Sequence, residues 1–166
     1  MLWKKDKLSI RQAEISDSEP LIQFLMEPGV LPYFPMCELK EVEDAAKVSV
    51  SYRDSNAAFT AEYDGEICGN TILYISPFTK NKRQCLFMII VGEKFRNKGI
   101  GSMMLDHLFE VAKNEHNINL LHLEVYEDNP ARKLYERKGF EQYGVHPKFL
   151  KEPDGFRDKI LMQKKL

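Results

Sequence analysis

Cysteine is scarce in this sequence, with three residues among 166. Cys37, Cys68 and Cys85 are an odd number and lie far apart, so we expect free thiols rather than a disulfide framework. The four histidines, at positions 107, 116, 122 and 146, show no H-x-x-H or H-x₃-H pairing. Because zinc sites on helices use such spacings, we expect no bound metal.

An excess of either charge is also absent, because 24 Lys and Arg residues nearly balance 25 Asp and Glu residues. A chain without a global positive field is poorly suited to nucleic acid or to a membrane surface, so neither is expected as a partner. No apolar run approaches the roughly 18 residues that span a bilayer. The first residues, MLWKKDK, lack a signal-peptide hydrophobic region, and we expect a cytoplasmic protein. Residues 1–166 are long enough for one domain with its own core.

An apolar run from Cys85 to Val91 precedes a basic turn and a helical pattern that begins at Ile100. The run has the length of a buried strand, and Gly92 and Gly99 separate it from the helix. The stretch therefore predicts a strand, a tight turn and a helix in sequence.

Three basic residues of this turn, Lys94, Arg96 and Lys98, precede the helix. Cations at a helix N-terminus oppose the macrodipole, whereas an anion bound to the free amides would make them favourable. Gly99 and Gly101 would let the backbone approach such an anion. The G-K-[ST] of a P-loop and the third glycine of a Rossmann turn are missing. The turn predicts a phosphate-sized site, and an ordinary glycine-containing turn is the alternative.

A second segment, NPARKLYERKGF at residues 129–140, narrows the interpretation of this turn. Together with RNKGIG at 96–101 it resembles the GCN5-related N-acetyltransferase superfamily. The first stretch matches the family's R/Q-x-x-G-x-G/A pyrophosphate turn, and the second its N-x-x-A-x-x-L-Y segment followed by G-F. The spacing from Asn129 to Tyr135 is one residue shorter than usual. The resemblance covers about residues 57–163.

The hydrophobic patterns predict an α/β (α+β) fold with six to seven strands and about four helices. Strands are expected at 8–13, 57–63, 66–75, 85–91, 118–126, 140–150 and 156–162, and helices at 17–27, 38–52, 100–115 and 128–139. Because a helix joins the fourth and fifth strands, that pair is expected to be parallel in a mostly antiparallel sheet. The resemblance implies that this pair splays apart.

The resemblance implies that acetyl-CoA is the co-substrate and lies between the splayed strands, whose free backbone groups an amide-bearing ligand can satisfy. The pantetheine arm would pair with the backbone of Ile89, Ile90 and Val91. The pyrophosphate would rest on the amides of the turn, contributed by Arg96, Asn97, Lys98, Gly99, Ile100 and Gly101. Asn129 would contact the pantetheine from the opposite side, and a plain helix cap is its alternative role.

The same resemblance implies the catalytic groups. Tyr135 matches the general acid that protonates the leaving thiolate, and the amide of Val91 would donate to the oxyanion. Many family members carry an acidic base on the fourth strand where this chain has Phe87. Glu124 resembles the base position of the ribosomal-protein N-terminal acetyltransferases. An ordered water as base, with Glu124 a plain strand residue, is the alternative.

The acceptor side is expected near residues 30–37, an apolar segment whose prolines exclude a regular helix. Tyr33, Phe34 and Met36 are the candidates for acceptor contact, and packing on the core is their alternative. We expect an N-acetyltransferase that moves an acetyl group from acetyl-CoA to a primary amine of a small molecule or peptide by direct attack. A non-catalytic acyl-CoA-binding or regulatory domain and a nucleotide binder are the alternatives, and a homodimer is an open option.

Overall fold

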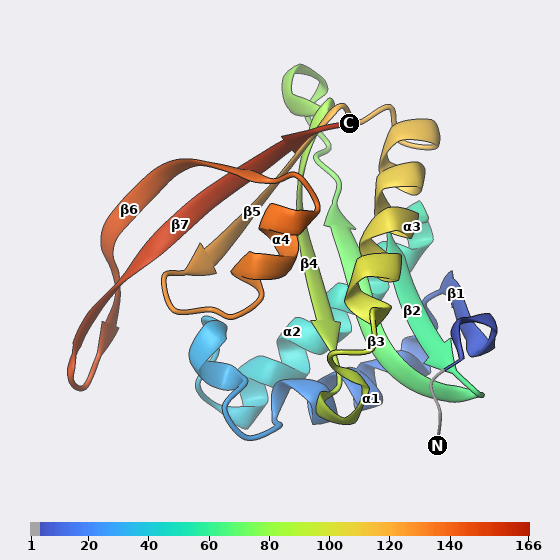
Figure 1. Ribbon diagram of the computed structural model, residues 1–166, viewed down its shortest axis with the longest axis horizontal. Coiled ribbons are helices and arrows are strands. Elements are labelled where there is room, and N and C mark those ends of the chain that lie inside the picture. Colours follow the sequence, from blue (N-terminus) through green and yellow to red (C-terminus); the bar gives the residue numbers. More distant parts are fainter. Residues whose placement is uncertain (1–3) are drawn as a thin grey trace.

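A seven-stranded mixed sheet carries the fold in the computed structural model, which describes residues 4–166 (Figure 1). The strand order is β1-β2-β3-β4-β5-β7-β6. The strands are β1 (Leu8–Gln12), β2 (Ala58–Tyr63), β3 (Glu66–Tyr74), β4 (Gln84–Val91), β5 (Leu120–Tyr126), β6 (Glu141–Glu152) and β7 (Gly155–Lys165). The α-helices are α1 (Ser18–Leu25), α2 (Leu39–Ser51), α3 (Ile100–Asn114) and α4 (Arg132–Arg137). The predicted fold class is confirmed.

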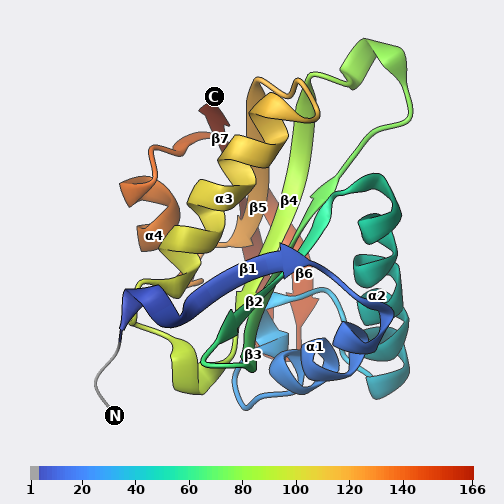
Figure 2. The same cartoon turned by 90° about the vertical axis from the view of Figure 1, so that its right-hand side faces the viewer.

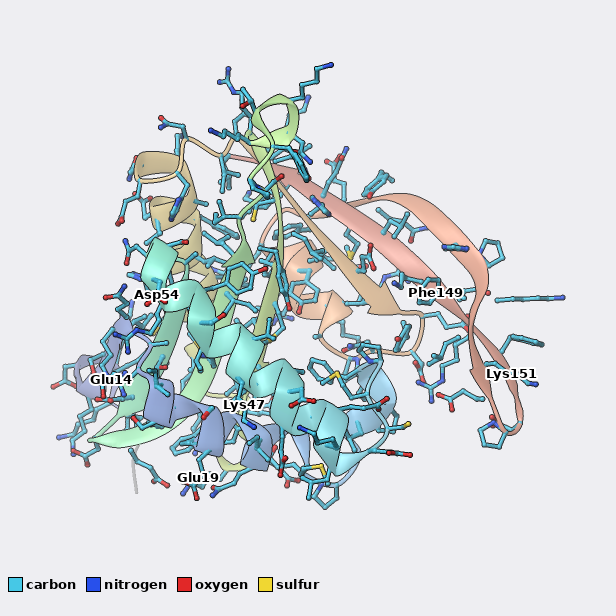
Figure 3. All side chains as sticks on the ribbon, turned by 180° about the vertical axis from the view of Figure 1, so that it is seen from behind. Glu14, Glu19, Lys47, Asp54, Phe149 and Lys151 are labelled. Atoms are coloured by element: carbon cyan, nitrogen blue, oxygen red, sulfur yellow. The ribbon has the colours of Figure 1, made fainter. Side chains whose placement is uncertain are left out.

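The helices cover both faces of the sheet because each buries one apolar stripe. Figure 2 shows α1 and α2 on one side of the sheet and α3 and α4 on the other. Figure 3 shows Glu19 of α1 and Lys47 of α2 on the outer surface of their layer. In α3 the buried stripe includes Leu105, which is fully buried, whereas Met103 is only half-buried.

The one parallel pair diverges along its length. Strands β4 and β5 pair only at Gln84–Leu120, Cys85–Leu121 and Leu86–His122. Beyond these pairs β4 continues to Val91 on its ladder with β3, and β5 continues to Tyr126 on its ladder with β7. The predicted splay is therefore present, and it opens toward the N-terminus of α3 (Figure 1).

Two segments at the mouth of the splay differ in detail from the predicted elements. Residues Leu31–Tyr33 form one turn of 3-10 helix with Pro32 in its first positions, so the segment is a loop with a short helical turn. Helix α4 begins at Arg132 rather than at 128, because the Oδ1 of Asn129 accepts the Ala131 amide at 2.9 Å and caps the turn before it.

All three cysteines are free thiols, with Cys68 and Cys85 buried and Cys37 exposed. Over residues 4–166 no helix is long and apolar enough to cross a membrane, and no group of His, Cys, Asp and Glu is arranged to hold a metal ion.

Strands β6 and β7 form a long hairpin, with Phe149 and Lys151 near its far end (Figure 3).

A buried ion pair joins β1 to the start of α1. The Arg11 guanidinium donates to both oxygens of Asp17, at 2.8 and 3.0 Å, and the Asp17 side chain is only 3% exposed. The Thr60 hydroxyl and the Glu14 amide also donate to this carboxylate, at 2.6 and 2.8 Å. Burial raises the pKa of Asp17, but these hydrogen bonds outweigh burial and hold the pKa below its ordinary 3.8.

Asp17→Asn should lower the free energy of unfolding by about 2 kcal/mol at pH 7, because it removes the buried one of the two carboxylates that pair with the half-buried Arg11, the other being Glu62. Urea unfolding measures this difference. The difference should begin to shrink as the pH falls below 3.8, where the Asp17 carboxylate of the unfolded chain takes up a proton, and should be lost once the pH passes the lowered pKa of the folded state. Asp44→Asn is the control, since Asp44 is 56% exposed in its pair with Lys40 and should change stability by less than about 0.5 kcal/mol.

Candidate active site

A cavity of about 630 Å³ lies between the diverging ends of β4 and β5, a size typical of small-ligand sites. Its walls come from β4, the turn before α3, the first residues of α3, β5, α4 and the loop at residues 29–34. Among the residues predicted from the sequence, it brings together Tyr33, Phe34, Ile89, Ile90, Val91, Arg96, Asn97, Gly99, Ile100, Gly101, Glu124, Asn129 and Tyr135. Met36 and Lys98 are the two predicted residues that do not line it.

The backbone of β4 presents alternate residues to this cavity. The carbonyl oxygen of Ile90 lies 2.8 Å from the position that a Cβ on Gly69 of β3 would take, so the Ile90 backbone faces β3. Since backbone groups alternate in direction along a strand, those of Ile89 and Val91 face the splay. The Ile90 backbone is thus directed to β3 and its side chain packs in the core with α1 and α2, contrary to the expectation that its backbone would pair with a ligand in the cavity.

The Arg96 side chain is held within the turn before α3. Its Nε donates to the Val91 carbonyl at 2.9 Å, and its Nη2 donates to Glu27 Oε2 at 2.7 Å. Glu27 also accepts the Glu93 amide, at 2.9 and 3.0 Å from its two oxygens. Glu27 thus fastens the end of α1 to the turn, and because its partners lie 66 and 69 residues away, the sequence offered no signal for it.

The two other basic residues of the turn are also engaged. Lys94 pairs with Glu66, and the ammonium of Lys98 donates to the Lys94 carbonyl. Both ammonium groups also lie near the Phe95 ring, at 5.0 and 5.6 Å from its centroid. The turn therefore offers an anion its backbone amides rather than three free cations.

The first turn of α3 supplies such amides. Gly99 precedes the helix at a φ of 81°, where glycine is favoured, and no side chain caps the helix there. Ile100, Gly101 and Ser102 follow it in the cavity wall. Free first-turn amides together with the helix dipole form an anion site. A Cβ on Gly101 would come within 3.2 Å of Leu134 Cδ2, so glycine lets α4 lie close to this turn.

Tyr135 comes from α4 and is 7% exposed. Its ring meets the rings of Phe87 and Phe140 edge-on, with centroids 6.0 Å apart in both pairs. Burial raises the pKa of Tyr135 above its ordinary 10.0, so the hydroxyl keeps its proton through the neutral range. Within residues 4–166 this hydroxyl has no hydrogen-bond partner in the structure, and it is free to donate to a ligand. Phe87, which stands on the fourth strand where an acidic base was considered, packs against this tyrosine.

Glu124 lies on β5 in the opposite wall of the cavity. Its Oε2 accepts a hydrogen bond from Lys159 of β7 at 2.5 Å, and the Lys159 ammonium lies 3.4 Å from the centre of the Phe149 ring. Lys159 had no signal in the sequence, since only the antiparallel β5–β7 ladder brings it beside Glu124. His122, on the same face of β5, bonds Gln84 at 2.5 Å and lies outside the cavity lining.

The remaining predicted residues divide between lining and packing. Asn129 caps the approach to α4 and also lines the cavity, so the cap and a ligand contact are compatible. Tyr33 and Phe34 line the mouth, while Met36 packs against the core between the sheet and helices α1 and α2. The loop that carries the two aromatic rings is held by Arg157 of β7, whose Nη1 donates to the Pro32 carbonyl at 2.8 Å.

Comparison with known proteins gives one consistent result. Residues 21–140 match the model of the acetyltransferase (GNAT) family. The L-amino acid N-acetyltransferase AaaT of Escherichia coli is 26% identical over 145 residues, covering 86% of this chain and 88% of that protein. An N-alpha-acetyltransferase of Sulfurisphaera tokodaii is 30% identical over 154 residues, covering 86% and 85%. The Salmonella typhimurium protein yncA, solved with its cofactor acetyl-CoA, superimposes with a TM-score of 0.81 at 15% identity, covering 96% and 94%.

Proposed function

Because this chain belongs to the acetyltransferase (GNAT) family and is an acetyl-CoA-dependent N-acetyltransferase, we propose that its acceptor is a primary amine on an apolar group. Such an amine could belong to a small molecule or to the first residue of a peptide. The observation that carries the proposal is the joining of one carboxylate, one buried tyrosine and an aromatic mouth in a single cavity.

The cavity fits acetyl-CoA as co-substrate, which would bring the thioester to be attacked. The backbone groups of Ile89 face the splay and would pair with its pantetheine amides, and the first-turn amides of α3 would receive its pyrophosphate. Asn129, on the other side of the cleft, would contact the same arm. These assignments require no metal and no covalent enzyme intermediate.

The proposed reaction is direct attack of the amine on the thioester carbon. A nitrogen–carbon bond forms, the carbon–sulfur bond breaks, and CoA leaves as the thiol. Glu124 takes one proton from the ammonium group, which frees the nitrogen lone pair for attack. Tyr135 gives a proton to the departing sulfur, and the second proton lost by the nitrogen restores the Tyr135 hydroxyl, so that the proton taken by Glu124 is the one released to solvent. The Val91 amide donates to the oxygen that becomes negative, since the Val91 carbonyl is already bonded to Arg96 and its amide faces the splay.

The acceptor half of the cavity is mostly apolar. Tyr33, Phe34 and Met88 line it, and Glu124 is its carboxylate. The charge of Glu124 is already paired with Lys159, so little negative charge is left for an acceptor with several ammonium groups. These contacts favour an amine with an apolar neighbour over a polyamine.

Thiol release from acetyl-CoA should be at least about 10-fold greater, as kcat/KM, for phenylalanine, methionine and peptides that begin with them than for spermidine. The apolar neighbour gains contact with the aromatic mouth, whereas the extra ammonium groups of spermidine gain no carboxylate. Preference for spermidine would contradict the acceptor assignment. Silence for every amine, with acetyl-CoA binding intact, would support the non-catalytic alternative, which no comparison favours.

A further inference from the structure

Two cations on α4 face the cavity without a carboxylate partner. Lys133 and Arg137 both line it, and within residues 4–166 neither forms an ion pair or a side-chain hydrogen bond. Their spacing of four residues places both on one side of the helix, where like charges repel. Two exposed cations kept together in this way are stabilised when an anion lies between them.

The other basic residues of this region already have hydrogen-bond or ion-pair partners. On α4 itself, Arg132 pairs with Glu136 at 3.0 Å, and Lys138, just past its end, pairs with Asp106 of α3 at 2.7 Å. In the turn before α3, Lys94, Arg96 and Lys98 are held by Glu66, Glu27 and a carbonyl oxygen, respectively. Among the described residues, the cavity-lining cations still available to a ligand are therefore the two on α4.

Their place relative to the turn defines which part of a ligand they can reach. Leu134, next to Lys133, approaches Gly101 so closely that a Cβ on that glycine would lie 3.2 Å from it. Lys133 and Arg137 thus belong to the helix that packs against the first turn of α3, and both line the same cavity as that turn. A ligand whose pyrophosphate rests on the turn can place a further phosphate against them.

We propose that Lys133 and Arg137 form a subsite for the 3′-phosphate of the CoA nucleotide and make the enzyme select CoA over 3′-dephospho-CoA. The inference rests on the proposed function, because it takes the pyrophosphate of acetyl-CoA to lie on the turn. It assigns the pyrophosphate to backbone amides, which do not distinguish the two ligands, and the 3′-phosphate to side-chain cations, which do.

Calorimetric titration with CoA and with 3′-dephospho-CoA tests the subsite without requiring turnover. Wild type should bind CoA at least about 10-fold more tightly, since two charge-assisted contacts are made to the extra phosphate. The double variant Lys133→Gln with Arg137→Gln should lose that preference, with CoA weakened to the level of 3′-dephospho-CoA and the affinity for 3′-dephospho-CoA unchanged. The preference should also decline as salt rises.

Arg132→Gln is the matched control, because Arg132 lies on the same helix, is paired with Glu136 and does not line the cavity. It should keep the wild-type preference. Equal affinity of wild type for both ligands, or an equal loss for both in the double variant, would overturn the subsite while leaving the acetyltransferase proposal standing. Failure of wild type to bind either ligand would instead overturn the proposed cofactor site and the subsite with it.

Discussion

Tyr135→Phe should lower the kcat of acetyl transfer by about 10²–10⁴, the range expected when a positioned acid is removed. The hydroxyl has no hydrogen-bond partner among residues 4–166, so its removal breaks no bond that stabilises the fold. The ring is retained, and with it the edge contacts to Phe87 and Phe140. The variant should therefore fold and bind acetyl-CoA as wild type does. Steady-state thiol release and calorimetric titration with acetyl-CoA measure the two effects separately.

Tyr143→Phe is the control for this substitution, because Tyr143 is 53% exposed on the β6 strand and lies outside the cavity lining. It should leave kcat unchanged. The dependence of the wild-type kcat on pH is a second test. Because burial raises the pKa of Tyr135 above 10.0, the acid stays protonated and kcat should show no loss from its deprotonation in the neutral range. Unchanged turnover in Tyr135→Phe would remove Tyr135 from the mechanism and leave it as a core residue.

The sequence predicted the elements because each is decided by local pattern. The alternation of β5 and the apolar stripe of α3 follow from residues a few positions apart, and the helix between β4 and β5 requires that pair to be parallel. Gly99 was also predictable, since a glycine at a positive φ is a local requirement of the turn. The cavity lining follows from these elements together with the family motif at Tyr135.

The contacts that set the charge of the site were not predictable. Glu27 reaches Arg96 across 69 residues, Lys159 reaches Glu124 across 35, and Arg157 reaches the loop at Pro32 across 125. Each depends on how distant elements stack, which no local pattern specifies. The sequence therefore indicated an anion site with three cations, whereas the structure engages all three elsewhere.

Because the cations of the turn and the carboxylate of Glu124 all have partners, the two walls of the cavity have different roles. The turn before α3 is pre-organised, with Arg96 held by Glu27 and by the Val91 carbonyl, and its amides need no rearrangement to receive a phosphate. The opposite wall carries Glu124, whose charge is balanced by Lys159. An acceptor amine therefore meets a carboxylate that the protein already holds in place from β7.

Glu124→Gln should lower kcat/KM by about 10²–10³ at neutral pH, because the variant cannot accept the proton that the attacking amine must lose. The substitution keeps the shape of the side chain and an acceptor oxygen for Lys159, so binding of acetyl-CoA should not change. Thiol release with an α-amine acceptor, measured from pH 6 to pH 9.5, tests the role. An α-amine has a pKa of about 8, and above it the acceptor is already neutral in solution.

The loss should accordingly shrink as the pH rises through about 8, since the amine then arrives without the proton that Glu124 would remove. Glu127→Gln is the control, because Glu127 lies just past β5, accepts the Asp158 amide at 3.3 Å and does not line the cavity. It should retain wild-type kcat/KM across the range. A loss in Glu124→Gln that stays constant with pH would indicate that Glu124 orients β5 and Lys159 rather than accepting a proton. An ordered water would then be the base.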